Sequence, residues 1–208
     1  MATSVFILIA YLIGSLSFAV IVSRAFGLPD PHSYGSGNPG ATNVLRSGRK
    51  AAALLTLIGD GAKGWIAVFL ALKFGPAWGV DADGVAAVSL AVFIGHLFPV
   101  FFGFRGGKGV ATALGVMLAL NIWLGLSVLA TWLLAAYMWR ISSLSALIAA
   151  TFAPFYAMLT LQTHVYIWAM LTLTLLILWR HKTNIRNLLT GREGGRERSE
   201  RPQDIPPQ

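Results

Sequence analysis

The stretch from Val110 to Trp139, VATALGVMLALNIWLGLSVLATWLLAAYMW, carries no charged residue. At a rise of about 1.5 Å per residue, one helix of this length would extend ~45 Å, whereas the hydrocarbon core of a bilayer is ~30 Å thick. The stretch must therefore fold back on itself, and Asn121 is its most polar residue. The sequence predicts a short helix that ends near Asn121 and a longer one from Trp123 to Trp139.

The whole chain has the composition of a membrane protein. Of its 208 residues, 56% are hydrophobic and 12% are charged, and the mean hydropathy is +0.68. These values exclude a water-soluble globule, and also a disordered chain, which needs low hydrophobicity and high charge. Because the chain has no cysteine, disulfide scaffolds, thiolate metal sites and thiol catalysis are excluded too.

Further apolar stretches have lengths suited to membrane helices. They run from Ser4 to Ser23, Ala51 to Leu72, Val85 to Phe104, Ile141 to Leu161 and His164 to Trp179. A cleaved signal peptide is the alternative for the first, but the start of the chain lacks a basic region. We expect an all-α polytopic membrane protein of about seven transmembrane helices, with a kink at Pro154.

The loops between these stretches differ in charge when they are assigned alternately to two sides. One side receives 14 of the 16 lysine and arginine residues, seven of them in the C-terminal 29 residues. The positive-inside rule then places the N-terminus outside and the C-terminus in the cytoplasm. We expect one membrane domain over residues 1–191 and a disordered cytoplasmic tail over 192–208. No aromatic residues interleave with the tail cations, so nucleic acid is not an expected partner.

Four polar segments lie on the expected cytoplasmic side and could together form one site. They are Pro29 to Arg46, Phe104 to Thr112, Arg140 to Ser145 and Arg180 to Asn187.

The first segment contains Gly35-Ser-Gly-Asn-Pro-Gly-Ala-Thr-Asn43. A dinucleotide fingerprint would follow a strand, and a P-loop would have lysine where Ala41 stands, so neither interpretation holds. The glycines still let backbone N–H groups approach an anion, ahead of a helix expected to run from about Ala41 into the second span. Arg46 could bind phosphate oxygens; the alternative is a connector with Arg46 at the lipid headgroups.

The second segment repeats this arrangement, because Gly106, Gly107 and Gly109 surround Lys108 just before a helix. Two cationic, glycine-rich helix starts suggest two phosphate groups. The alternative for Lys108 is an anchor at the membrane surface.

Other polar residues allow a structural and a functional interpretation. His96 lies inside an apolar helix and either makes a structural hydrogen bond or takes part in the site. Asp60 and Lys63 are three residues apart, and a structural ion pair is favoured over a proton pathway. Ser142 and Ser143 either bind phosphate or cap the sixth helix, and His181 and Asn184 either join the site or mark a helix end at the interface.

Four blocks make the chain similar to the bacterial acyl-phosphate:glycerol-3-phosphate acyltransferases, the PlsY family. They are Gly35 to Asn43, His96-Leu-Phe-Pro-Val100, Gly106-Gly-Lys-Gly-Val-Ala-Thr112 and Ser142-Ser-Leu144. The resemblance covers roughly residues 5 to 193. It implies transfer of a fatty acyl group from acyl phosphate to the 1-hydroxyl of glycerol 3-phosphate, at the cytoplasmic face of the inner membrane. Membrane lipid and the enzyme that supplies acyl phosphate are implied partners, and no cofactor or metal is expected.

The resemblance also assigns roles to the candidate residues. The implied catalytic group is Arg46, His96, Lys108 and His181. The implied substrate-binding group is Ser36, Gly37, Asn38, Gly40, Asn43, Gly106, Gly107, Gly109, Ser142, Ser143 and Asn184, with Ser143 the favoured serine of its motif.

Two other classes of protein are compatible with the residues alone. A transporter or channel for an organic phosphate should place ionisable groups along a path through the bilayer, yet only Asp60, Lys63 and His96 lie within spans. A structural membrane subunit would leave the cationic glycine loops without a purpose.

Overall fold

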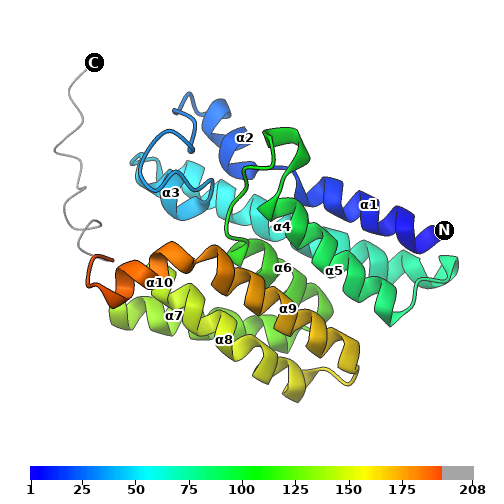
Figure 1. The fold of residues 1–208 in the computed structure, drawn as a ribbon. Helices are drawn as coiled ribbons and strands as arrows, with labels where there is room; N and C mark the ends of the chain where they lie inside the picture. Colours follow the sequence, from blue (N-terminus) through cyan, green and yellow to red (C-terminus); the bar gives the residue numbers. More distant parts are fainter. Residues whose placement is uncertain (194–208) are drawn as a thin grey trace.

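The computed structural model describes residues 1–193, which fold into a bundle of helices (Figure 1). The longer helices are α1 (Ala2–Gly14), α4 (Lys50–Phe74), α5 (Ala82–Leu97), α6 (Val110–Leu120), α7 (Ile122–Trp139), α8 (Ser142–Thr160) and α9 (His164–Arg180). Shorter elements are α2 (Phe18–Ala25), α3 (Ala41–Leu45), α10 (Lys182–Leu189) and the 3₁₀ turns η1 (Gly75–Trp78) and η2 (Val100–Phe102).

The expected apolar segments are all present as helices. By length and composition, Lys50–Trp78, Ala82–Phe102, α7 and α8 can each cross a membrane, and α1 with α2 can form one bent span. The two shorter apolar helices, α6 and α9, correspond to the other two segments that the sequence predicts. The total of seven spans and the orientation of the termini stay predictions.

The fold-back at Asn121 is confirmed, and its cause is local. The Asn121 side chain accepts hydrogen bonds from the backbone N–H groups of Trp123 (2.8 Å) and Leu124 (3.2 Å), so it caps the start of α7. Its amide nitrogen donates to the Thr160 carbonyl at the end of α8 (3.2 Å). One polar side chain therefore satisfies backbone groups of two helices at the turn.

The sequence predicts one continuous helix for the first span. The structure instead has two helices, α1 and α2, with an angle of 41° between them. At the break, the Leu16 carbonyl accepts a hydrogen bond from Lys63 Nζ at 2.7 Å. Lys63 also lies 2.9 Å from Asp60 Oδ1, which confirms the expected ion pair, and both side chains are buried. Because a buried ammonium group needs several acceptors, the interrupted helix supplies one that a regular helix would not.

The helix expected to run from Ala41 into the second span is also interrupted. Helix α3 ends at Leu45 and α4 begins only at Lys50, with Gly48 between them at a φ of 78°. The glycine at positive φ turns the chain between the two helices.

Pro154 lies inside α8 without ending the helix. Proline has no N–H, so the Ala150 carbonyl loses its partner one turn away. Thr174 Oγ1 of α9 donates to that carbonyl at 2.8 Å. The neighbouring helix therefore satisfies the group that proline leaves unpaired.

Helix α4 packs closely along α6. A Cβ atom at Gly115 would lie only 2.0 Å from the Gly61 carbonyl oxygen, so the two backbones approach more closely than any side chain would allow. Small residues at such crossings are typical of membrane helices, whose association depends on close packing. This contact holds the middle of α6 beside α4.

Candidate active site

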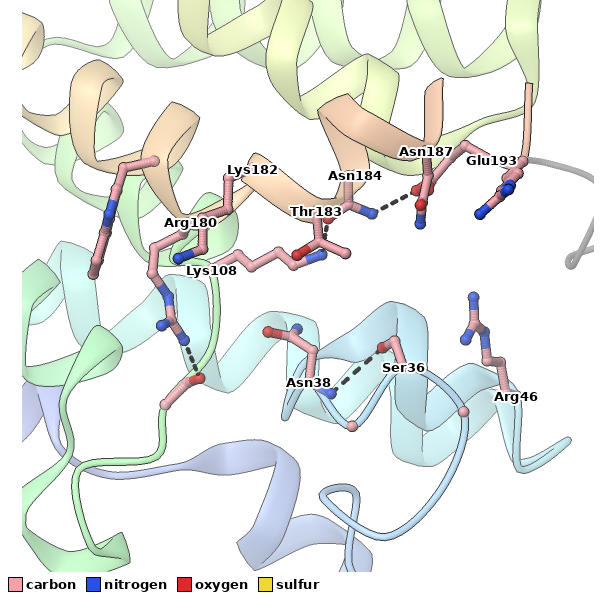
Figure 2. A pocket seen from close by; sticks show the side chains of 15 residues that line it. Ser36, Asn38, Arg46, Lys108, Arg180, Lys182, Thr183, Asn184, Asn187 and Glu193 are labelled. Atoms are coloured by element: carbon pink, nitrogen blue, oxygen red, sulfur yellow. Dashed lines mark hydrogen bonds between the residues drawn. The ribbon is translucent and has the colours of Figure 1, made fainter. Parts of the chain in front are cut away.

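Three of the four polar segments meet at one end of the bundle, around a polar cavity of about 630 Å³ (Figure 2). The remaining segment, Arg140 to Ser145, contributes Ser142 and Ser143 to a neighbouring cavity. The lining residues of the polar cavity come from four parts of the chain. These are the segment Pro29 to Arg46, called the first glycine loop, the residues from Phe104 to Gly109, called the second glycine loop, the end of α9, and α10 with the residues after it. They are Gly35, Ser36, Gly37, Asn38, Arg46, Gly106, Lys108, Trp179, Arg180, Lys182, Thr183, Asn184, Asn187, Arg192 and Glu193. Five cations and one carboxylate make this a site suited to anions.

The conformation of the first glycine loop depends on Asn43, the buried third residue of α3. Asn43 Oδ1 accepts from the Ser36 backbone N–H (2.9 Å) and hydroxyl (3.2 Å), while Nδ2 donates to the carbonyls of Pro31 (2.8 Å) and Tyr34 (3.2 Å). Gly35 has a φ of 57°, and a Cβ there would lie 2.3 Å from Asn43 Oδ1. The polar atoms of Asn43 therefore hold the loop in its conformation, and the expected contact of Asn43 with substrate stays a prediction.

Lys108 and Asn184 connect the second glycine loop with α10. Lys108 Nζ donates to Asn184 Oδ1 at 2.5 Å. Burial lowers the pKa of Lys108, the nearby Arg180 and Arg46 lower it further, and Glu193 partly offsets them. An ammonium group with this little solvent has a strong need for an anionic partner.

Glu193 joins the site from a position that the sequence places in the tail. Its Oε1 accepts from Ser143 Oγ (2.6 Å) and from Asn184 Nδ2. Burial opposes its ionisation, but hydrogen bonds from Ser143, Asn184 and Asn187 outweigh this and lower its pKa. The carboxylate thus links α8 to α10. The remaining tail, residues 194–208, lies outside the described residues.

A second cavity of about 610 Å³ lies between α4, α6, α7 and α8 and is mainly apolar. Leu57, Ile58, Leu114, Met117, Val128 and Trp132 are among its lining residues. It shares one wall with the polar cavity, formed by Ser36, Asn38, Arg46, Lys108, Asn184 and Glu193. A molecule with an anionic head and an apolar chain can therefore occupy both cavities at once.

The two serines at the start of α8 line the apolar cavity, and neither caps the helix. The N-cap is Ile141, without a side-chain hydrogen bond. Ser143 is buried and bonded to Glu193, whereas Ser142 is half-buried. The contact with Glu193 supports Ser143 as the serine of its motif.

His181, between α9 and α10, is buried and lines the apolar cavity. Its Nδ1 lies 2.8 Å from the Ile177 carbonyl oxygen, which only accepts, so Nδ1 carries the proton and Nε2 keeps its lone pair. Burial lowers the pKa of His181 to about 4. The imidazole is therefore neutral at physiological pH and can accept a proton at Nε2.

His96 lies deeper, near the end of α5. Its Nδ1 is 3.6 Å from Asp60 Oδ1, and its backbone carbonyl accepts from the Gly107 N–H at 3.2 Å. His96 thus lies between the buried ion pair and the second glycine loop, and it lines the apolar cavity.

The structure brings the expected site residues together. All of the candidates except Gly107 line one or both cavities. Six further polar residues that line the polar cavity were not predicted as site residues from the sequence: Arg180, Lys182, Thr183, Asn187, Arg192 and Glu193. The spacing of Thr183, Asn184 and Asn187 places them on one face of a helix, and this signal could have added the first and last of them. Among residues 1–193, no cluster of three His, Asp or Glu side chains could hold a metal ion.

Comparison with known proteins agrees with this geometry. The family model described as "Glycerol-3-phosphate acyltransferase" matches residues 4–191. The chain belongs to the glycerol-3-phosphate acyltransferase family. Glycerol-3-phosphate acyltransferases of Janthinobacterium sp. (strain Marseille) and Cupriavidus pinatubonensis are 64% and 61% identical over 93% of this chain and 96% of theirs.

Solved structures of a family member resemble this acyltransferase closely. PlsY, an integral membrane glycerol 3-phosphate acyltransferase, has been solved in a glycerol 3-phosphate form and a lysophosphatidic acid form. Both are 36% identical and cover 93% of this chain and 94% of theirs, with TM-scores of 0.86 and 0.85. The chain is thus an integral membrane glycerol-3-phosphate acyltransferase, and the interpretations as a transporter or a structural subunit are set aside.

Proposed function

We propose that this acyltransferase takes its acyl group from an acyl phosphate and transfers it to the 1-hydroxyl of glycerol 3-phosphate. The products are lysophosphatidic acid and inorganic phosphate, in the first acylation step of phospholipid synthesis. The proposed location is the inner membrane of a bacterium, with the site facing the cytoplasm. The excess of lysine and arginine in the loops on the same side as the site supports this orientation.

The main support for acyl phosphate as the donor is the wall shared by the two cavities. In an acyl phosphate the phosphate is joined directly to the acyl carbonyl, so a chain in the apolar cavity would place the reacting carbon beside Arg46 and Lys108. A thioester donor would instead separate its carbonyl from its phosphates by a long arm. The absence of a histidine followed five residues later by aspartate, the pattern of acyltransferases that use soluble donors, also favours acyl phosphate.

The proposed reaction is a direct displacement. The 1-hydroxyl oxygen of glycerol 3-phosphate attacks the acyl carbon and forms the ester bond. The bond from that carbon to the phosphate oxygen breaks, and phosphate leaves with the electron pair. Because a mixed anhydride has a good leaving group, no acyl-enzyme is needed, and the chain has neither a cysteine nor a G-x-S-x-G motif.

The chain's own residues would hold the two phosphates and stabilise the charge on the departing one. Arg46 and Lys108 lie on the shared wall and would neutralise this charge in the transition state. Ser36, Ser143, Asn184 and the glycine-loop amides would orient the phosphates and the attacking hydroxyl.

Two groups can take the proton from the hydroxyl: a phosphate oxygen of the substrate and His181 Nε2. Replacement His181→Asn separates them, because asparagine can keep the hydrogen bond to the Ile177 carbonyl but offers no basic nitrogen. General-base catalysis contributes about 10²- to 10⁴-fold. A fall in kcat of that size would assign the proton to His181, and a smaller fall would assign it to the phosphate.

The donor is tested with the purified protein in detergent or lipid. Glycerol 3-phosphate is supplied with palmitoyl phosphate, palmitoyl-CoA or palmitoyl-carrier protein, and inorganic phosphate and lysophosphatidate are followed. We expect equal amounts of both products with palmitoyl phosphate and none with the other donors. Turnover with a thioester donor alone would contradict the proposal.

A further inference from the structure

Three consecutive peptide carbonyls of the second glycine loop accept hydrogen bonds from distant side chains. The Arg105 carbonyl lies 2.9 Å from His32 Nε2. Arg180 donates from Nη2 to the Gly106 carbonyl (2.7 Å) and from Nε to the Gly107 carbonyl (3.1 Å), and Figure 2 shows the first of these bonds. The backbone just before Lys108 is thus held by the first glycine loop and by the end of α9.

The opposite side of this loop packs against the end of α5. The Gly107 N–H donates to the His96 carbonyl, and a Cβ at Gly106 would lie 2.1 Å from that carbonyl oxygen. With contacts on both sides, the loop has little freedom to change the position of Lys108.

His32 connects to the first glycine loop through Asp30. His32 Nδ1 lies 2.6 Å from Asp30 Oδ1, and the His32 backbone N–H donates to the same oxygen at 2.9 Å. Both ring nitrogens of His32 therefore face acceptors, the Asp30 carboxylate on one side and the Arg105 carbonyl on the other. His32 lines neither cavity, so it can act on the reaction only through the loops.

We propose that His32 is a positioning residue for the acyl transfer, because it ties the two glycine loops together and thereby fixes Lys108 relative to Ser36 and Asn38. The two loops carry the groups proposed to hold the two phosphates, and the His32 bond bridges 73 positions of sequence between them. The inference rests on the proposed role of Lys108 in the reaction.

The first test compares His32→Ala with His32→Arg. Alanine removes both bonds, whereas the guanidinium fork of arginine can donate to a carboxylate and a carbonyl at once. We expect His32→Ala to lower kcat by about 10- to 100-fold, the effect of misplacing a catalytic group by about 1 Å, with the KM for glycerol 3-phosphate changed by less than about threefold. His32→Arg should recover most of kcat. His164→Ala, at an exposed position on the first turn of α9, is the control and should leave both constants unchanged.

A double-mutant cycle separates positioning from general destabilisation. If His32 acts through Lys108, His32→Ala should have no further effect on kcat in a Lys108→Ala background. Additive losses, or an unchanged kcat in His32→Ala, would overturn the inference. If Lys108→Ala alone keeps near-normal activity, the proposed role of Lys108 in the reaction is wrong. The Lys108 variant shows this without any change at His32, so failure of the proposed function is distinguished from failure of the inference about His32.

Discussion

At the scale of single residues, we expect the largest loss of activity from replacing either of the two cations on the wall shared by the cavities, Arg46 and Lys108. Replacement of Arg46 or Lys108 by alanine should lower kcat about 100-fold, because each would remove one preorganised charge from the departing phosphate. The measurement is the rate of phosphate release from palmitoyl phosphate in the presence of glycerol 3-phosphate. Lys182→Ala, which removes a cation that lines only the polar cavity, is the matched control and should cost much less. Near-normal activity in Arg46→Ala or Lys108→Ala would contradict the role proposed for that residue.

His181 should make stability depend on pH. Its pKa is lowered from 6.5 to about 4 by burial, so between these values the unfolded chain binds a proton that the folded protein does not. Stability should therefore fall as the pH decreases from 6.5 to 4, by up to about 3 kcal/mol, and level off below that range.

The melting temperature in detergent at pH 7 and pH 4.5 checks this dependence. The native protein should lose more thermal stability on acidification than His181→Asn, which has no titrating ring. Equal losses in the two proteins would show that other groups cause the acid sensitivity.

At the scale of helices, the crossing of α4 and α6 is the most demanding contact. A Cβ at Gly115 would lie 2.0 Å from the Gly61 carbonyl oxygen, whereas a Cβ at Gly61 would meet its nearest atom, the Ala111 carbonyl oxygen, at 3.7 Å. Gly115→Ala should therefore destabilise the protein by about 1–3 kcal/mol, the usual cost of overpacking. Gly61→Ala changes the same crossing from the other side and should be tolerated.

Thermal unfolding of the two glycine variants gives a direct comparison. Because α6 begins directly after the second glycine loop, Gly115→Ala should also lower activity by shifting Lys108. Equal melting temperatures for the two variants would mean that α4 and α6 can move apart at this crossing without a loss of stability.

At the scale of the whole molecule, the direction of the bundle in the membrane is open to a simple test. The chain has no cysteine, so single cysteines introduced at exposed positions can be labelled without background. A cysteine replacing Lys50, at the end of the bundle that holds the site, should react with a membrane-impermeant maleimide only after cells are permeabilised. A cysteine replacing Asp83, near the start of α5, should react in intact cells. The reverse pattern would refute the proposed orientation.

The sequence by itself predicted the helical segments, the fold-back at Asn121, the Asp60–Lys63 pair and most of the site. These features depend on local properties: the length of an apolar run, one polar residue within it, the spacing along a helix, and glycines beside cations. Such signals persist whatever surrounds them, so they could be interpreted before any contact was known.

Tertiary structure decided what depends on partners from elsewhere in the chain. The break in the first span coincides with a carbonyl that Lys63 needs, and the polar atoms of Asn43 bind its own loop. Glu193, in a segment that resembles a disordered tail, joins the site through Ser143 and Asn184. Composition does not encode these pairings, because hydrogen bonds and burial act across distances in sequence that only the folded chain brings together.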